Sequence, residues 1–87
     1  MIKVAICDDD IQFIYKLEQS IFRFAGMKRI KVDVDGYTSG AEFIQKLQQS
    51  ERYDLLFLDI ELGDSSGIIV GNWIRSQIQY ESMQIVF

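Results

Sequence analysis

The stretch from Tyr53 to Gly67, YDLLFLDIELGDSSG, decides the fold of this chain. Four consecutive apolar residues, Leu55 to Leu58, end on the carboxylate Asp59, and a polar loop that contains glycine follows at once. An apolar run of this length between turn signals predicts a strand that is buried on both faces. Asp59 then stands where the strand leaves the core, at its carboxyl end. In open parallel sheets, ligands and reactive groups gather at that edge.

The composition describes one acidic globular domain. The chain has 87 residues, of which 48% are apolar, and a formal net charge of -4, which argues against direct nucleic-acid contact. No stretch is long enough to span a membrane. The single cysteine, Cys7, cannot form an internal disulfide, so a reducing, cytoplasmic location is expected. Because the chain has no histidine, serine-histidine triads and most zinc sites are excluded, and carboxylates with a metal must carry any chemistry.

Three more strands are predicted around this central run. Ile2 to Cys7 is rich in β-branched residues and predicts a buried strand. Residues 30–34 alternate apolar and charged side chains, as an edge strand with one solvated face does. Met83 to Phe87 begins like another buried strand. All three runs are separated from one another by segments with helical spacing.

Apolar residues recur at intervals of three to four in those segments. The predicted helices cover residues 11–24, 43–47 and 69–78. Asp9 or Asp10 can cap the first helix, and Gly26 is its expected C-terminal end. A capping-box sequence precedes the second helix, and Ser65 or Ser66 can cap the third.

Alternating strands and helices are typical of right-handed βαβ crossovers and a parallel sheet. The alternation at residues 30–34 places the second strand at an edge, whereas the first and third strands are largely apolar and should be central neighbours. We therefore predict an α/β fold, a partial flavodoxin-like doubly wound sheet with strand order 2-1-3-4, in one domain over residues 1–87.

Three aspartates are then predicted to meet at one edge of the sheet. Asp8 and Asp9 follow the first strand, and Asp59 follows the third, its neighbour. Any single acid of this kind is more often a cap or a turn residue. Carboxylates this close repel one another, which raises at least one pKa unless a cation compensates. The expected cation is Mg²⁺ before Ca²⁺, and Asp59 would be a nucleophile that forms an aspartyl-phosphate.

The chain resembles the response-regulator receiver domains of two-component signalling. The matching segments are IKVAICDDD, YDLLFLDIELGDSSG and MQIVF, and GYTSGAEFI is most similar to receivers of LytTR-type regulators. The resemblance implies that Asp59 is the phosphoacceptor, that Asp9 binds Mg²⁺ directly, and that Asp8 acts mainly through water. It further implies that the backbone carbonyl of Glu61 is a metal ligand and that Gly67 is the loop glycine before the third helix.

The resemblance also implies what such a module does. A sensor histidine kinase would transfer a phosphoryl group from its phosphohistidine to Asp59, with Mg²⁺ required. A receiver is not a conventional enzyme, although many members hydrolyse their own aspartyl-phosphate. Its phosphorylation usually controls an output domain, often a DNA-binding one that regulates transcription.

Compared with this family, the chain is expected to be truncated at its C-terminus. Receivers have five βα units, and the fifth is missing here, together with a switch Ser or Thr just past Phe87 and a lysine after the fifth strand. We therefore expect weak Mg²⁺ binding and slow or absent phosphorylation. An open strand edge and a bare sheet face should also make the chain a homodimer.

Two other interpretations stay open at the sequence level. In the first, Asp8 and Asp10 form the DxD of a haloacid-dehalogenase-type phosphatase, as nucleophile and acid/base. Gln12 then stands in place of the usual threonine or valine, and Asp59 has no role. In the second, the receiver scaffold is a non-catalytic module for dimerisation or kinase docking.

Overall fold

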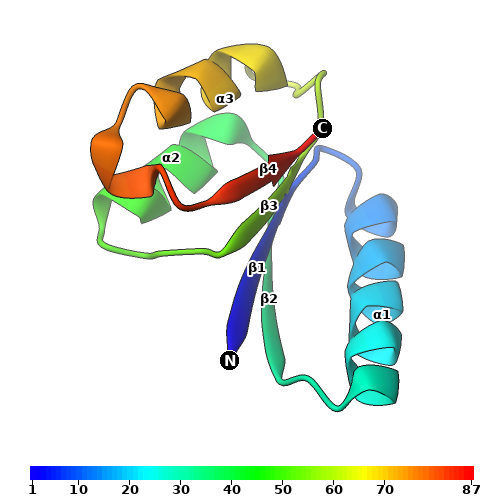
Figure 1. Ribbon diagram of the computed structural model, residues 1–87. Coiled ribbons are helices and arrows are strands. Elements are labelled where there is room, and N and C mark those ends of the chain that lie inside the picture. Colours follow the sequence, from blue (N-terminus) through cyan, green and yellow to red (C-terminus); the bar gives the residue numbers. More distant parts are fainter.

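Four parallel strands form the centre of the molecule, which a computed structural model describes over residues 1–87 (Figure 1). The strands are β1 (Ile2–Cys7), β2 (Val32–Tyr37), β3 (Leu55–Leu58) and β4 (Gln84–Val86). They lie in the order β2-β1-β3-β4, and each neighbouring pair is parallel. The predicted α/β fold and strand order are therefore confirmed. β2 is an edge strand, as its alternating sequence predicted.

Three helices cover the two faces of the sheet unequally. Helix α1 (Ile11–Lys28) lies alone on one face, and α2 (Gly40–Gln48) and α3 (Gly67–Arg75) lie on the other (Figure 1). A 3₁₀ turn, Ile78–Tyr80, leads into β4. The main core cluster comprises 13 buried residues and includes Phe43, Leu47, Leu56, Leu58, Val70 and Ile74, so it fills the space between the sheet and the α2–α3 layer. None of the helices has the length and apolar character that crossing a lipid bilayer requires.

Each of the three helices has a side-chain cap at its N-terminus. The Asp10 carboxylate accepts hydrogen bonds from the backbone N–H groups of Gln12 and Phe13, at 2.9 and 3.2 Å, and so caps α1. Ser39 and Ser66 cap α2 and α3 in the same way. Each cap satisfies N–H groups that the first turn of a helix leaves without a partner.

Two predicted helix ends were wrong. Gly26 does not end α1, which continues to Lys28, because the left-handed conformation that closes the helix is taken by Arg29, at φ 56°. Glycine lowers helix propensity but does not stop a helix whose buried side is already packed. α3 ends at Arg75, so Ile78 lies in the 3₁₀ turn and not in the helix.

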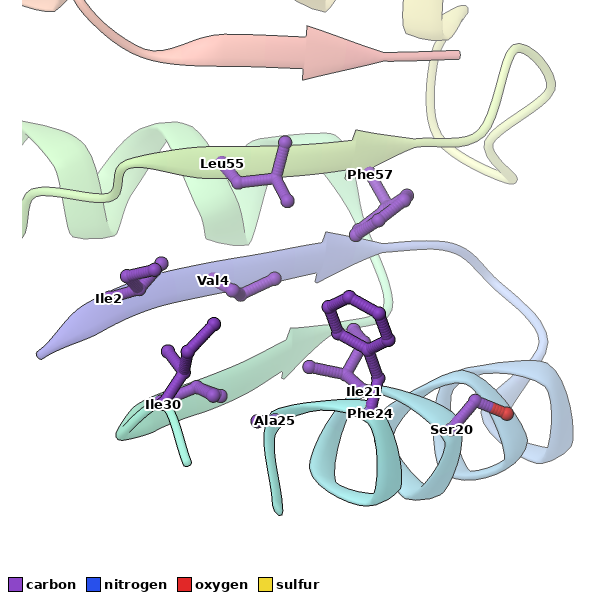
Figure 2. A pocket seen from close by; sticks show the side chains of 10 residues that line it. Ile2, Val4, Ser20, Ile21, Phe24, Ala25, Ile30, Leu55 and Phe57 are labelled. Atoms are coloured by element: carbon purple, nitrogen blue, oxygen red, sulfur yellow. The ribbon is translucent and has the colours of Figure 1, made fainter. Parts of the chain in front are cut away.

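Helix α1 covers only part of its face of the sheet. An added Cβ on Gly36 of β2 would lie 2.7 Å from Ile14 Cγ2, which shows how closely α1 approaches the β2 edge. Beside α1 the sheet is left open as a groove of about 360 Å³. Figure 2 shows the groove between α1 and strands β1 and β3, and its lining is apolar except for Ser20.

This groove corrects the prediction that β3 is buried on both faces. Leu56 and Leu58 face the core and are buried, whereas Leu55 and Phe57 point to the groove and are only partly buried (Figure 2). An apolar run shows that both faces of a strand can be buried. Whether the second face is buried depends on whether another helix packs against it.

Candidate metal site

The edge where β1 and β3 end brings two acidic segments together. Cys7 and Leu58, the last residues of these strands, are register partners in the parallel ladder. Beyond them, the N–H of Asp59 donates to the Cys7 carbonyl at 2.9 Å, and the N–H of Asp8 donates to Tyr37 of β2 at 3.0 Å. The backbone thus fixes where Asp8 and Asp59 leave the sheet, at the point where the strand order reverses.

Three of the predicted residues form one cluster at this edge. Carboxylate oxygens of Asp8, Asp9 and Asp59 all lie within 4.8 Å of one another. Asp8 and Asp59 are partly buried, and Asp9 is exposed. Cys7, directly before them, is fully buried, and its burial raises the pKa of the thiol to about 12, so it stays protonated and acts as a core residue.

The electrostatics of the cluster favour a bound cation. Burial, followed by the negative charges of Asp59 and Asp9, raises the pKa of Asp8 above its ordinary value, although a 2.8 Å hydrogen bond from the Asp10 N–H opposes this. A hard divalent ion would compensate such repulsion, and carboxylate oxygens are the donors that suit Mg²⁺. The chemistry of these residues therefore fits the predicted metal.

The loop after β3 leaves one backbone carbonyl, that of Glu61, without a hydrogen bond. Leu62 N–H donates to Ser65, and Gly67 N–H donates to Ile60 at 2.7 Å, so Glu61 lies between these two bonds and its own carbonyl accepts no hydrogen bond. The Glu61 N–H donates to Asp59 Oδ1 at 3.3 Å. The Glu61 side chain is exposed, which leaves the backbone oxygen as the group that could bind a metal.

Gly67 touches the acceptor segment from the other side. A Cβ added to Gly67 would lie 1.8 Å from the carbonyl oxygen of Asp59 and 3.0 Å from Ile60 Cα. No side chain can be accommodated there without moving the backbone of the residue that stands at the centre of the site. The loop glycine is therefore required for its small size.

Asp10, the third acid after β1, does not join the cluster. Its carboxylate caps α1, as described above, and it is absent from the group of three converging acids. The phosphatase interpretation needs Asp10 as an acid/base beside Asp8, so this cap disfavours it.

One residue of the site region was missed by sequence reasoning. Asp64 Oδ1 and Oδ2 accept hydrogen bonds from the N–H groups of Gly40 and Ala41, at 3.1 and 3.0 Å. These two bonds lower the pKa of Asp64. An aspartate beside a glycine in a loop indicates a turn, and no local pattern predicts that it reaches the start of a helix earlier in the chain.

A segment of one known protein is similar to this chain in sequence. The chain is 34% identical over 80 residues to the hybrid signal transduction histidine kinase L of Dictyostelium discoideum, a match that covers 86% of this chain but only 4% of that protein. No protein-family model matches the chain.

Solved structures that resemble the chain are response-regulator receivers. It aligns with the chemotaxis response regulator CheY4 of Vibrio cholerae at 26% identity and a TM-score of 0.76, over 98% of this chain and 65% of that one. The MaeR response regulator bound to beryllium trifluoride is 20% identical with a TM-score of 0.80, over 99% of this chain and 65% of that one. The signal receiver domain of a LuxO repressor protein from Vibrio parahaemolyticus is 23% identical with a TM-score of 0.75, over 95% of this chain and 57% of that one. The chain therefore has the CheY-like receiver fold without a fifth βα unit, and it spans less than two thirds of these structures.

Proposed function

We propose that these residues form the phosphoacceptor receiver module of a two-component response regulator, in which Asp59 accepts a phosphoryl group from a sensor histidine kinase. The observation that carries this proposal is the convergence of Asp8, Asp9 and Asp59 within 4.8 Å at the ligand-binding edge of a receiver fold. The similarity to a hybrid histidine kinase and to response regulators supports a role in two-component signalling.

In the proposed reaction, a carboxylate oxygen of Asp59 attacks the phosphorus of a phosphohistidine. The new O–P bond forms as the P–N bond breaks, and the imidazole leaves with the electron pair and takes up a proton. Asp9 and the Glu61 carbonyl would hold Mg²⁺ together with Asp59, and Asp8 would act through water. When bound, the ion neutralises charge on the phosphoryl oxygens.

The 87-residue polypeptide is expected to accept phosphate only with Mg²⁺, because the ion would compensate the negative charges of Asp8, Asp9, Asp59 and the incoming phosphoryl group. Incubation with a small acyl phosphate, with Mg²⁺ or with a chelator, followed by mass spectrometry, checks this expectation. Phosphoryl incorporation that proceeds equally well in chelator would overturn it.

The single cysteine and the net charge of the chain bear on its location and its partners. The single thiol is buried and has no disulfide partner, which fits a reducing, cytoplasmic location. The formal net charge of -4 makes direct nucleic-acid contact by this segment unfavourable, so any control of transcription would pass to an output domain.

The open groove and the free edge of β4 favour a second function, association with another copy of the chain. Phe24 beside the groove is 58% exposed, and Phe87 beside the β4 edge is 62% exposed. Covering such surface with a second copy would remove apolar area from water on both chains. This surface also supports the docking-module interpretation, which needs no phosphoryl transfer.

We expect light scattering to find a homodimer at micromolar concentration. Phe24→Gln should weaken the dimer because it places a polar group in the groove. Met27→Gln is the matched control, since Met27 lies on the same helix, is 75% exposed and does not line the groove. A clean monomer of the parent chain, or equal effects of both substitutions, would contradict the proposed interface.

A further inference from the structure

Asp64 belongs to the loop that follows Asp59, yet its carboxylate is bonded to another element. Both of its oxygens are used, one by the N–H of Gly40 and one by the N–H of Ala41. These amides lie in the first turn of α2, where a helix leaves N–H groups without intrahelical partners and its dipole attracts negative charge. The loop is thereby attached to α2 at two points, and we name this arrangement the Asp64 clamp.

The opposite side of the same loop faces the acidic cluster. A Cβ added to Gly63, the neighbour of Asp64, would lie 3.8 Å from Asp9 Oδ2. Glu61, with its free carbonyl, precedes Gly63 in the loop. The segment between Asp59 and Asp64 therefore has the candidate metal site on one side and α2 on the other.

Helix α2 is a firm support for the clamp. Phe43 is fully buried and Leu47 is 1% exposed, so α2 is held by the main core. Gly40 lets the loop come close, because a Cβ there would lie 3.0 Å from Ser65 Oγ and 3.2 Å from Leu62 Cδ1. In the loop itself Leu62 also joins this core, whereas Glu61, Gly63 and Asp64 are exposed, so the Asp64 clamp adds a second, polar anchor next to Leu62.

We propose that Asp64 is a positioning residue of the metal site, which fixes the loop so that the Glu61 carbonyl and the Asp59 carboxylate stay aligned with Asp8 and Asp9. This inference rests on the proposed function, because it concerns the same site. Asp64 contacts neither the ion nor the phosphoryl group and acts only through the loop. Groups that orient metal ligands from outside in this way commonly affect metal affinity. By linkage, occupancy of the site would also hold the first turn of α2 more firmly.

Three substitutions of Asp64 separate the clamp from the plain effect of its charge. Asp64→Ala removes both acceptors, Asp64→Asn keeps one acceptor without charge, and Asp64→Glu keeps the charge but moves the carboxylate. Glu42→Gln is the charge control, because Glu42 lies in the first turn of α2 and its side chain is not in the clamp. Mg²⁺ affinity is measured by calorimetry on the 87-residue chain, with circular dichroism to verify folding.

The clamp predicts that Asp64→Ala weakens Mg²⁺ affinity about tenfold, the lower end for residues that orient metal ligands. Asp64→Asn should lie between the parent and Asp64→Ala, and Asp64→Glu should be nearly as weak as Asp64→Ala. Amide hydrogen exchange at Gly40 and Ala41 should become faster in Asp64→Ala. A charge effect alone would lower Mg²⁺ affinity equally in Asp64→Ala, Asp64→Asn and Glu42→Gln and would leave it unchanged in Asp64→Glu. That result would overturn the proposal.

The outcomes also distinguish this inference from the proposed function. If the parent and Asp64→Ala bind Mg²⁺ equally while Asp59→Asn does not bind it, the role of Asp64 is wrong and the proposed site stands. If the parent binds no Mg²⁺ at all, the proposed function fails, and the positioning role fails with it. If Asp64→Ala does not fold, the isosteric change Asp64→Asn at this exposed position still decides between the clamp and the charge effect. Only the clamp predicts that Asp64→Asn lowers Mg²⁺ affinity more than Glu42→Gln does.

Discussion

Asp59→Asn is expected to abolish phosphoryl incorporation, by more than about 10³-fold, because an amide cannot replace the attacking carboxylate. The measurement is mass spectrometry after incubation with an acyl phosphate and Mg²⁺. Asp8→Asn is the informative comparison, since it removes a charge from the same cluster and leaves the acceptor intact. We expect Asp8→Asn to slow incorporation without preventing it. The opposite result, in which only Asp8→Asn abolishes incorporation, would make Asp8 the nucleophile and favour the phosphatase interpretation.

Asp59→Asn should also stabilise the metal-free chain. Burial and the charge of Asp59 raise the pKa of Asp8, so in the folded state Asp8 resists ionisation. A carboxyl group with a raised folded pKa contributes stability below its unfolded pKa of about 3.9 and loses it as the pH rises through the folded pKa. Asp59→Asn removes one of the charges behind that loss, which predicts a higher free energy of unfolding at neutral pH and almost no change near pH 3. Urea unfolding at the two pH values in a chelator tests the sign, and an equal gain at both would contradict it.

Gly67→Ala is expected to destabilise the chain by about 3 kcal/mol and to eliminate Mg²⁺ binding. The added Cβ would overlap the Asp59 carbonyl oxygen at 1.8 Å. Because the Cβ position is fixed by the backbone of residue 67 and its partner is a backbone atom, no side-chain rotation can relieve the clash. The backbone of Asp59 has to move, and the site moves with it. Urea unfolding gives the change in free energy, and calorimetry gives the loss of binding.

Gly26→Ala is the matched control for this prediction. Gly26 lies within α1, and a Cβ there would meet no atom within 4 Å. Alanine has the higher helix propensity, so this substitution should stabilise the chain by about 0.5–1 kcal/mol and leave Mg²⁺ affinity unchanged. If both glycine substitutions had the same effect, the close approach at Asp59 would not be the cause.

Local patterns were sufficient for the strand order and for the acids at its edge. Alternation at residues 30–34 identified an edge strand, and the apolar runs of β1 and β3 identified the central pair, whose ends carry Asp8, Asp9 and Asp59. These inferences succeeded because burial at a central strand and solvation at an edge each leave a periodic signature.

The features that sequence reasoning missed depend on contacts between distant segments. The end of α1 is set by the conformation of Arg29, not by the presence of Gly26. The partial exposure of Leu55 and Phe57 depends on whether a second helix covers their face of the sheet. Asp64 reaches α2 through the packing of the loop on Gly40, which no spacing along the chain indicates.

The pairing of β1 with β3 joins the most distant segments of the sheet. Val4 is the register partner of Leu55, whereas along β2 it pairs with Val34, so the β1–β3 contact closes the longer loop. Closing a longer loop costs more chain entropy. An ion shared by Asp9 and Asp59 would bridge the ends of these two strands and would act as a removable cross-link on the longest loop that strand pairing closes. A chelator would then loosen the centre of the sheet before its edges.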